Sequence, residues 1–545
     1  MKRFKINLEY MVDKVLYKTN VFETEHFNIN YIAKESHIKL DINPNVPMEN
    51  VKFKMTVPYD FRSNSRIFLN GFQSWTECRE HFIDDEPLRL DVKQEAIRRV
   101  LPTSPYGDYN FVKYDRRKGC FHGFSYGYVR NEKEFDFFGS LSERFGYTII
   151  RANVPDREII FERDLEGVII DNEYTLIDVI NYRGSEKDVY DKYFTDMNIP
   201  KPRVGRTNGY TTWYNYYANI NENIVVNDLE ALSQVDSKID IFQIDDGYQT
   251  AVGDWLSINY DKFPNGMKII ADKIHEKGMK AGLWLAPLSV QVKSKVAKEH
   301  PDWLIHDKYG KKLLCGVNWG NFYGLDIEKE EVREYIRNFF NVVLNDWGYD
   351  MVKLDFLYSA SVIPRNGKSR GQLMCEAMDF IRECVGDKLI LGCGVPLAPA
   401  FGKVDYCRIG ADIGLEWTKF KVHLEDVCTR TTLWNTIFRR GLDGRAFAND
   451  PDVFLLRDNN MTMGLTQRKI SATVNHIFGS LLFTSDNVGD YNREKMDVLL
   501  HIFNNSQPEL ISAEFITKDL IEINYLENGE KKRLCFDSNT GELML

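Results

Sequence analysis

The sequence lacks the features of a secreted, membrane-spanning or nucleic-acid-binding protein. Its nine cysteines are an odd number, lie scattered from Cys78 to Cys535, and form neither a CxxC pair nor a metal-ligand spacing, which favours a reducing compartment. The N-terminus has no apolar signal-peptide region, and no run approaches the about 18 apolar residues of a spanning helix. Basic residues (70) are fewer than acidic ones (80) and are nowhere concentrated, so nucleic acid and anionic membranes are poor candidate partners. These absences predict a soluble, cytoplasmic protein.

Motifs for bound nucleotides and metals are also missing. The sequence contains no GxGxxG after a first strand and no GxxxxGK(S/T), so the phosphate-binding loops of dinucleotide and P-loop proteins are absent. Its ten histidines form neither an HxxxH nor an HxH pattern, and the carboxylates at 450–452 have no further ligand at a metal-site spacing. We therefore expect no cofactor and no metal.

The chain is long and rich in apolar residues, and its pattern changes twice. At 545 residues with 43% hydrophobic side chains, it can hold several domains with large cores. Residues 1–198 alternate polar and apolar positions in short stretches such as 37–42 and 157–164, which predicts an N-terminal β-sandwich. Residues 506–545 contain two such stretches on either side of Asn528-Gly529 and are expected to form a small C-terminal β domain.

Between these parts, residues 199–505 combine short apolar strands with helical patterns such as 331–348. The strand candidates are 209–216, 239–247, 279–287, 349–358, 388–396, 405–414, 445–453 and 480–487. Eight strands alternating with helices predict a central (β/α)8 barrel, and a doubly wound open sheet is the structural alternative. The predicted fold class is a multidomain α/β protein, with this barrel, an N-terminal β-sandwich and a small C-terminal β domain.

Active sites of such barrels form at the C-terminal ends of the strands, and here those ends carry carboxylates, two cations and tryptophans. The residues are Asp245 and Asp246 after the second strand, Lys353 and Asp355 on the fourth, Arg408 and Asp412 on the sixth, and Trp213 and Trp284 on the first and third. Aromatic faces stack on the C–H face of a sugar ring, and short acceptors fix its hydroxyls. The combination predicts a sugar site.

Spacing suggests roles for two of the carboxylates. Residues 353 and 355 are two apart on a strand, so both side chains point to one face, and the Lys353 cation favours the ionised Asp355 that a nucleophile needs. A structural ion pair is the alternative for this K-x-D sequence. Asp412 lies in a glycine-rich turn that could bring it toward Asp355 as a general acid; its alternative role is a helix N-cap.

The neighbouring pair after the second strand needs a break in that strand. Adjacent strand residues point to opposite faces, so Asp245 and Asp246 can both bind a ligand only if the strand ends there, which Gly247 allows. The alternative is one ligand-binding residue and one loop cap.

Several blocks, in order along nearly the whole chain, resemble the α-galactosidases of glycoside hydrolase family 36, which are related to family 27. The blocks are GFQSW (71–75), FQIDDGYQ (242–249), GLWLAP (282–287), EHPDWL (299–304), VKLDFLY (352–358), LGCGVPLAPAFGKVDYCRIGAD (391–412) and NDPDVFLLR (449–457). The family commonly has K-W-D at the nucleophile strand, where this chain has Leu354 between Lys353 and Asp355.

The resemblance implies a retaining exo-α-galactosidase that forms a covalent glycosyl-enzyme. By match to the family motifs, Asp355 would be the nucleophile and Asp412 the acid/base, with their carboxyl groups about 5 to 6 Å apart. The implied substrate-binding residues are Asp245 and Asp246 for the galactose O4 and O6, Lys353 and Arg408 for ring hydroxyls, Trp213 and Trp284 for the pocket walls, Trp75 from the N-terminal domain, and Cys393 near O2. Small oligosaccharides such as melibiose or raffinose are the implied substrates, and a homo-oligomer is a further implication.

Three other functions remain open at this point. An α-N-acetylgalactosaminidase would differ only in what the pocket permits at the sugar C2. A non-catalytic sugar-binding protein could use the same scaffold, although the presence of both Asp355 and Asp412 argues against it. A transglycosylase would use the same residues and differ in its acceptor.

Overall fold

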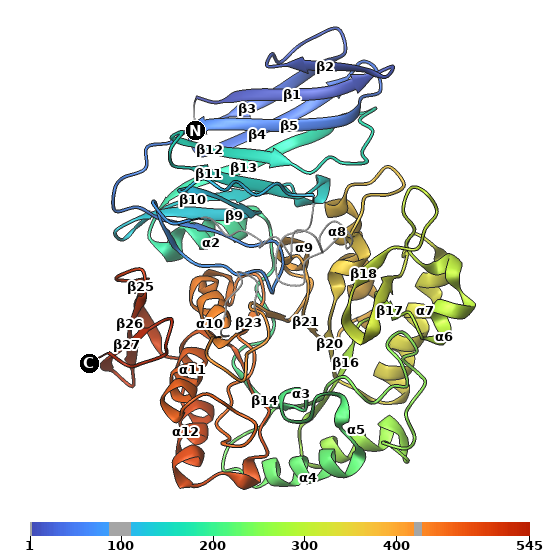
Figure 1. Cartoon of the computed structure of the whole chain (residues 1–545), viewed down its shortest axis with the longest axis vertical. Coiled ribbons are helices and arrows are strands. Elements are labelled where there is room, and N and C mark those ends of the chain that lie inside the picture. Colours follow the sequence, from blue (N-terminus) through green and yellow to red (C-terminus); the bar gives the residue numbers. More distant parts are fainter. Residues whose placement is uncertain (1–2, 87–110, 419–427, 545) are drawn as a thin grey trace.

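The computed structural model describes residues 3–86, 111–418 and 428–544 and has a central barrel with antiparallel sheets at both ends of the chain (Figure 1). This confirms the predicted fold class. That residues 1–198, 199–505 and 506–545 are separate domains stays a prediction.

The N-terminal part consists of two antiparallel sheets that share a core. The first has the order β2-β1-β5-β12-β11-β8 and comprises β1 (Lys5–Val12), β2 (Val15–Thr19), β5 (Glu49–Pro58), β8 (Cys120–Phe124), β11 (Thr148–Asn153) and β12 (Glu158–Arg163). The second has the order β3-β4-β13-β10-β9-β6-β7 and comprises β3 (Phe27–Ala33), β4 (His37–Pro44), β6 (Arg66–Leu69), β7 (His81–Phe82), β9 (Tyr126–Asn131), β10 (Glu134–Ser140) and β13 (Tyr174–Gly184). Alternate residues of β4 (Ile38, Leu40, Ile42) pack in one cluster with Phe53 and Met55 of β5, which is the period-two burial that the sequence predicted.

The central part is a nearly closed barrel of eight parallel strands. In sheet order these are β23 (Ala448–Asp450), β22 (Tyr406–Arg408), β21 (Leu389–Gly392), β20 (Met351–Leu354), β16 (Lys280–Leu285), β15 (Ile241–Ile244), β14 (Thr207–Thr211) and β24 (Leu481–Thr484). The ring closes between β23 and β24 through two backbone hydrogen bonds, from Ser480 N–H to Asn449 O (3.0 Å) and from Phe454 N–H to Phe483 O (3.0 Å). Each strand overlaps one predicted strand.

The first barrel strand ends earlier than predicted. β14 stops at Thr211, and Trp213–Tyr216 form the short helix α3, so the expectation that Trp213 lies on a strand is wrong. The chain turns here because Thr212 Oγ1 accepts the Asp245 N–H (2.9 Å), while the Ser485 hydroxyl donates to Thr211 O (2.5 Å) and accepts the Tyr214 N–H (2.9 Å). These bonds replace the ladder that a longer strand would need.

Helices cover the barrel and bury one apolar face each. The longer ones are α4 (Glu222–Ser233), α5 (Gly266–Glu276), α7 (Glu330–Asn341), α8 (Arg370–Val385), α10 (Thr429–Phe438), α11 (Leu465–Phe478) and α12 (Arg493–Asn504). In α7, Val332, Ile336, Phe339 and Phe340 are buried at helical spacing. α8 begins with a capping box between Ser369 and Gln372. α2 (Glu186–Asp196) precedes the barrel and contacts β10 and β13 of the N-terminal part, and α6 (Lys295–Glu299) and α9 (Leu397–Ala400) are short.

Two small antiparallel sheets complete the fold. β17 (Ser289–Gln291), β19 (Phe322–Gly324) and β18 (Leu314–Gly316) form an insertion after β16 that the sequence analysis did not predict. β25 (Glu509–Phe515), β26 (Leu520–Glu527) and β27 (Glu530–Asp537) form the C-terminal sheet, with Asn528-Gly529 at positive φ in the predicted hairpin turn. Phe515 stacks on Phe438 of α10 at 5.4 Å, so this sheet packs on the barrel.

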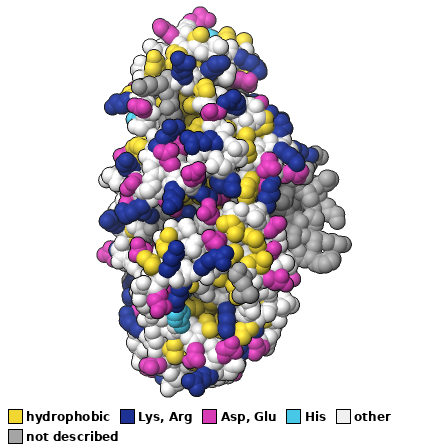
Figure 2. Space-filling model, turned by 90° about the vertical axis from the view of Figure 1, so that its left-hand side faces the viewer, with side chains coloured by type: hydrophobic (Ala, Val, Ile, Leu, Met, Phe, Trp, Pro, Cys, Tyr) yellow, Lys and Arg dark blue, Asp and Glu magenta, His cyan; other side chains and the backbone are white. Residues whose placement is uncertain are grey.

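On the face shown in Figure 2, basic and acidic side chains are intermingled, in keeping with the mixed charge of the sequence. Within residues 3–86, 111–418 and 428–544, no helix combines the length and the apolar surface that crossing a bilayer requires.

Candidate active site

A buried ion pair lies at the centre of the site. Lys353, near the end of β20, places Nζ 2.8 Å from Oδ2 of Asp245, and both side chains are almost fully buried. The same oxygen accepts a hydrogen bond from Gln243 Nε2 (2.8 Å). Burial lowers the pKa of the Lys353 ammonium, but the Asp245 and Asp355 carboxylates outweigh it and the pKa is raised. Lys353 therefore stays charged inside the barrel.

Asp246 follows directly and faces a different set of donors. β15 ends at Ile244, and Gly247 adopts a φ of +126° in a place where a Cβ would lie 2.6 Å from the Ala218 carbonyl oxygen, so the strand breaks as predicted. Asp246 accepts from Gln249 Nε2 (2.5 Å) and from the indole N–H of Trp319 (2.9 Å). Burial raises the pKa of its carboxyl, and these hydrogen bonds oppose the shift.

Asp355 lies just beyond β20 and is held by two N–H donors. Its Oδ2 accepts from the indole of Trp284 on β16 (3.1 Å), and its Oδ1 accepts from the Phe356 backbone (2.9 Å). Burial raises the pKa of Asp355, the Lys353 cation lowers it, and the Asp412 carboxylate raises it further. Asp355 and Asp412 thus lie near enough to influence each other across the barrel mouth.

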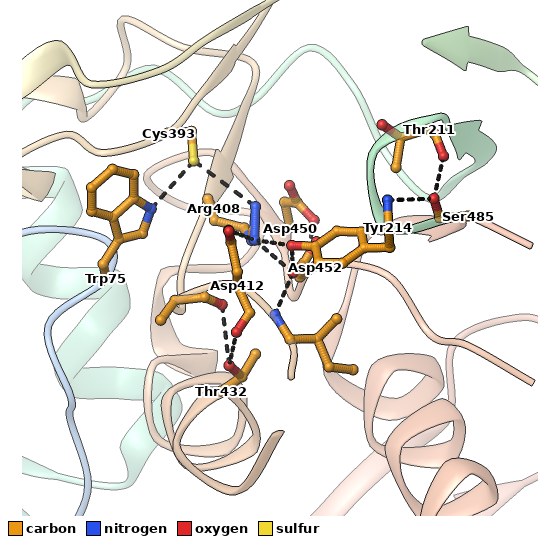
Figure 3. A network of polar contacts seen from close by, with 12 residues as sticks. Trp75, Thr211, Tyr214, Cys393, Arg408, Asp412, Thr432, Asp450, Asp452 and Ser485 are labelled. Carbon is orange, nitrogen blue, oxygen red and sulfur yellow. Dashed lines mark hydrogen bonds and ion pairs between the residues drawn. The ribbon is translucent and has the colours of Figure 1, made fainter. Parts of the chain in front are cut away.

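Around Arg408 at the end of β22, four polar side chains converge (Figure 3). One guanidinium nitrogen, Nη2, lies 2.7 Å from Asp412 Oδ1, 2.5 Å from Asp452 Oδ2 and 2.9 Å from the Tyr214 hydroxyl. Its Nη1 lies 3.9 Å from the sulfur of Cys393. The Asp412 side chain is 42% exposed, whereas that of Arg408 is 1% exposed. Asp412 is therefore far more exposed than the arginine that it binds.

The N-terminal part contributes Trp75 to this region. Its indole N–H donates to Cys393 Sγ (3.4 Å), and its ring contacts Phe356 edge to face at 5.1 Å. Gly394 has a φ of +54°, and a Cβ there would lie 2.8 Å from the Trp75 ring, so only glycine allows this approach. Trp75 and Cys393 therefore lie together beside the Asp355-Phe356 segment; that they bind substrate stays a prediction.

Arg439, at the end of α10, holds the segment that carries Trp75. It is completely buried, and its guanidinium donates to Asn70 Oδ1 (3.1 Å) and to the carbonyls of Gln73 (3.0 Å) and Ser74 (2.7 Å), as well as to that of Ile409 on the barrel side (2.7 Å). Because the same guanidinium binds segment 70–75 and the Ile409 carbonyl, this single buried cation joins that segment to the barrel.

Four residues that lie near the site were not selected from the sequence, namely Trp319, Tyr214, Asp452 and Arg439. Trp319 comes from the insertion between β18 and β19, and its ring lies 5.9 Å from Trp284; the Asn- and Gly-rich run at 318–321 was its only signal. Tyr214, Asp452 and Arg439 join the Arg408 and Trp75 regions. Trp213 is half-buried and contacts Tyr217 at 5.3 Å, and its role as a pocket wall stays a prediction.

This arrangement can bind a polyhydroxylated ring and transfer protons. Ionised and hydrogen-bonded carboxylates accept from hydroxyls, indole rings offer stacking faces, and two carboxylates in unlike environments suit acid and base roles.

Parts of the chain are similar in sequence to known proteins. Residues 208–376 match the family model described as Melibiase. α-Galactosidase Mel36A of Lactobacillus acidophilus is 35% identical over 132 residues, and an A type blood α-D-galactosamine galactosaminidase of Flavonifractor plautii is 34% identical over 124 residues. These segments cover 23% and 21% of this chain but only 17% and 11% of the two relatives.

Solved structures share the fold over nearly the whole chain. TtGalA, an α-galactosidase from Thermus thermophilus in complex with p-nitrophenyl α-D-galactopyranoside, superposes with a TM-score of 0.72 at 23% identity, covering 96% of this chain and 98% of that one. Structures of the GH36 α-galactosidase AgaA from Geobacillus stearothermophilus share the fold at TM-scores of 0.58 to 0.60. The similarity to the Melibiase model is confined to residues 208–376, and the chain shares the fold of the solved GH36 α-galactosidases.

Proposed function

We propose that the protein is an exo-acting α-galactosidase that releases terminal α-linked galactose from oligosaccharides of the melibiose or raffinose type with retention of configuration. The observation that carries this proposal is the pair Asp355 and Asp412, which follow β20 and β22 at the barrel mouth and differ in burial. The melibiase match and the names of the relatives support galactose as the sugar.

In this mechanism Asp355 attacks the anomeric carbon while Asp412 gives a proton to the leaving oxygen; a water molecule then attacks the glycosyl-enzyme with Asp412 as base. The Trp284 and Phe356 N–H groups orient the attacking carboxylate. The charged Lys353 favours its ionised form. Asp245 and Asp246 keep acceptor oxygens for sugar hydroxyls.

The proposal is tested by initial rates on p-nitrophenyl α-galactoside, with NMR detection of the first anomer released. The wild-type protein should release α-galactose, and Asp355→Asn should lower kcat by about a thousandfold or more without changing the thermal midpoint. Failure of the wild type on every α-galactoside overturns the activity, release of the β-anomer overturns retention, and an active Asp355→Asn removes the residue from the role.

An α-N-acetylgalactosaminidase is the second candidate, because one relative is named a galactosaminidase. The two activities differ at the sugar C2, where we place the contacting Cys393 and Trp75 side chains. We expect that this close contact excludes an acetamido group, so the N-acetylgalactosaminide should react at least about a hundredfold more slowly. Equal rates on the galactoside and the N-acetylgalactosaminide would overturn the proposed sugar specificity but not the proposed mechanism.

A cytoplasmic location and homo-oligomer assembly belong to the same proposal. None of the nine cysteines forms a disulfide, which agrees with a reducing compartment. Cell fractionation and light scattering test the two statements separately.

A further inference from the structure

Two carboxylates share one buried cation in the Arg408 group. Nη2 of Arg408 contacts both Asp412 and Asp452, yet the Asp452 side chain is 4% exposed and that of Asp412 is 42% exposed. If both carboxylates are ionised, the three side chains together carry one net negative charge. The Asp452 carboxylate is buried, so water does little to stabilise its charge. The group therefore favours binding one proton.

Asp452 is held in place by its surroundings. Oδ2 accepts the Ile413 N–H (2.7 Å) and the Tyr214 hydroxyl proton, while its own N–H donates to Asp450 Oδ1 (2.8 Å). Its backbone has a φ of +73°, a conformation that Asp and Asn tolerate better than most residues. Since the Tyr214 hydroxyl has a single proton and gives it to Asp452, Arg408 donates to the Tyr214 oxygen.

Asp412 has fewer restraints. Among the residues that the structure describes, its carboxylate forms an ion pair with Arg408 alone, and the Thr432 hydroxyl contacts its backbone carbonyl (3.2 Å) rather than its side chain (Figure 3). Arg408 is thus anchored on Asp452 and Tyr214 whether or not Asp412 is ionised. An arginine that paired with Asp412 alone would hold that carboxyl in the ionised form, which cannot act as an acid.

We propose that Asp452 is a positioning residue that engages Arg408 and thereby allows Asp412 to carry the proton that the acid step needs. The inference rests on the proposed function. Burial raises the pKa of the Asp452 carboxyl to about 6, Arg408 opposes this, and the Asp412 and Asp450 charges add to it. Among the described residues, the other titratable or charged groups around this cluster include Tyr214, Tyr217, Lys353, Asp355, Cys393, Cys407 and Arg457.

The test is Asp452→Asn, which keeps the shape and suits a positive φ. Loss of the Asp452 charge leaves Asp412 as the only carboxylate of the pair that binds Arg408, so the proton-donating step should be impaired. We expect the alkaline limb of the kcat/KM profile to move down by about one pH unit or more. At pH 7 the rate on melibiose, whose leaving group needs a proton, should fall about 10- to 100-fold, whereas 2,4-dinitrophenyl α-galactoside, whose leaving group does not, should change by less than about threefold.

A second variant guards against misfolding of the first. Tyr214→Phe removes the hydroxyl that stabilises ionised Asp452, so Asp452 should hold its proton more tightly and release Arg408 to Asp412. The alkaline limb should then shift in the same direction by a smaller amount. As a matched control, Asp164→Asn breaks a buried ion pair with Arg370 (3.0 Å) away from the site. This variant should lower the thermal midpoint, but it should change neither the alkaline limb of the kcat/KM profile nor the ratio of the rates on the two substrates.

The outcomes separate the two proposals. A wild type that is inactive on all α-galactosides overturns the proposed function. An active wild type whose Asp452→Asn and Tyr214→Phe variants keep the pH limb, or lose melibiose and dinitrophenyl activity equally, overturns the role of Asp452 alone.

Discussion

Lys353 binds Asp245 at 2.8 Å, at the end of the second strand along the sheet from its own, rather than pairing with Asp355 two residues along the chain. The sequence suggested the local pair, because residues two apart on a strand share a face. In the structure Asp355 is held instead by the Trp284 and Phe356 N–H groups. Lys353 acts on Asp355 through its charge, while its direct ion pair joins β20 to the end of β15.

This buried pair predicts a large stability effect. Lys353→Met should lower the free energy of unfolding by about 3 to 5 kcal/mol, because it leaves Asp245 buried and unpaired. Urea denaturation of Lys353→Met/Asp245→Asn should show a smaller loss than the single variant, since the second change removes the stranded charge. A single variant within about 1 kcal/mol of wild type contradicts the prediction.

Asp228 of α4 predicts a pH-dependent stability effect. It accepts hydrogen bonds from Tyr210 and Tyr216, and burial raises its pKa to about 6. Since the folded pKa exceeds the unfolded value of about 3.9, the contribution of Asp228 to stability is complete below about pH 4 and is lost as the pH rises through 6.

Asp228→Asn does not titrate, so it should be more stable than wild type at pH 8 by about 1 to 3 kcal/mol, with the difference vanishing near pH 4. Denaturation at several pH values checks this. Asp272→Asn, which removes a partly exposed carboxylate, should show no such pH trend; a constant offset for Asp228→Asn would argue against the assignment.

Arg439 predicts coupling between the N-terminal segment and the site. Arg439→Met should lower the thermal midpoint, because it removes the buried hydrogen bonds from the guanidinium to the Gln73 and Ser74 carbonyls. It should also raise KM more than it lowers kcat, because Trp75 loses its support. Arg337→Met, at an exposed ion pair with Glu330, is the control and should change neither. A variant that loses stability with wild-type KM would show that Trp75 does not depend on Arg439.

Chelation with EDTA should leave both the hydrolysis rate and the thermal midpoint unchanged. Within the described ranges, His476, His501 and Glu527 have donor atoms within 4.8 Å of one another, as a metal site would. However, Arg206 Nη2 lies 2.5 Å from His476 Nδ1. Since arginine can only donate, Nε2 of His476 carries the ring proton and has no lone pair for a metal. An EDTA-sensitive rate that Zn²⁺ or Mn²⁺ restores would contradict this.

Much of the barrel was predictable because parallel strands and their covering helices leave local patterns. The run at 349–358 and the helical spacing at 331–348 each indicate their own element, and the ends of barrel strands meet at one mouth whatever their loops do. Residues at strand ends, such as Asp246 and Asp355, could therefore be selected before the tertiary structure was known.

The misses have equally physical causes. Trp213 follows a β-like run, but β14 ends before it. The hydrogen bonds that end the strand join Tyr214 to Ser485 and Thr212 to Asp245, which are distant in the sequence. Trp319 and Arg439 reach the site from an insertion and a helix end, where no strand pattern marks them. Trp319 contacts Asp246, which is 73 residues away in the sequence, and Arg439 contacts Ser74, which is 365 residues away.

The sequence alone determined the strand and helix order, the carboxylates at the strand ends and the resemblance to a family, because these depend on local periodicity and on residue identity. Only the tertiary structure decided which charges pair. The structure pairs Lys353 with Asp245 and shares Arg408 between Asp412 and Asp452. Burial removes water from these charged groups, so each one binds the oppositely charged group that lies nearest. The packing of the barrel strands sets the distances between these groups.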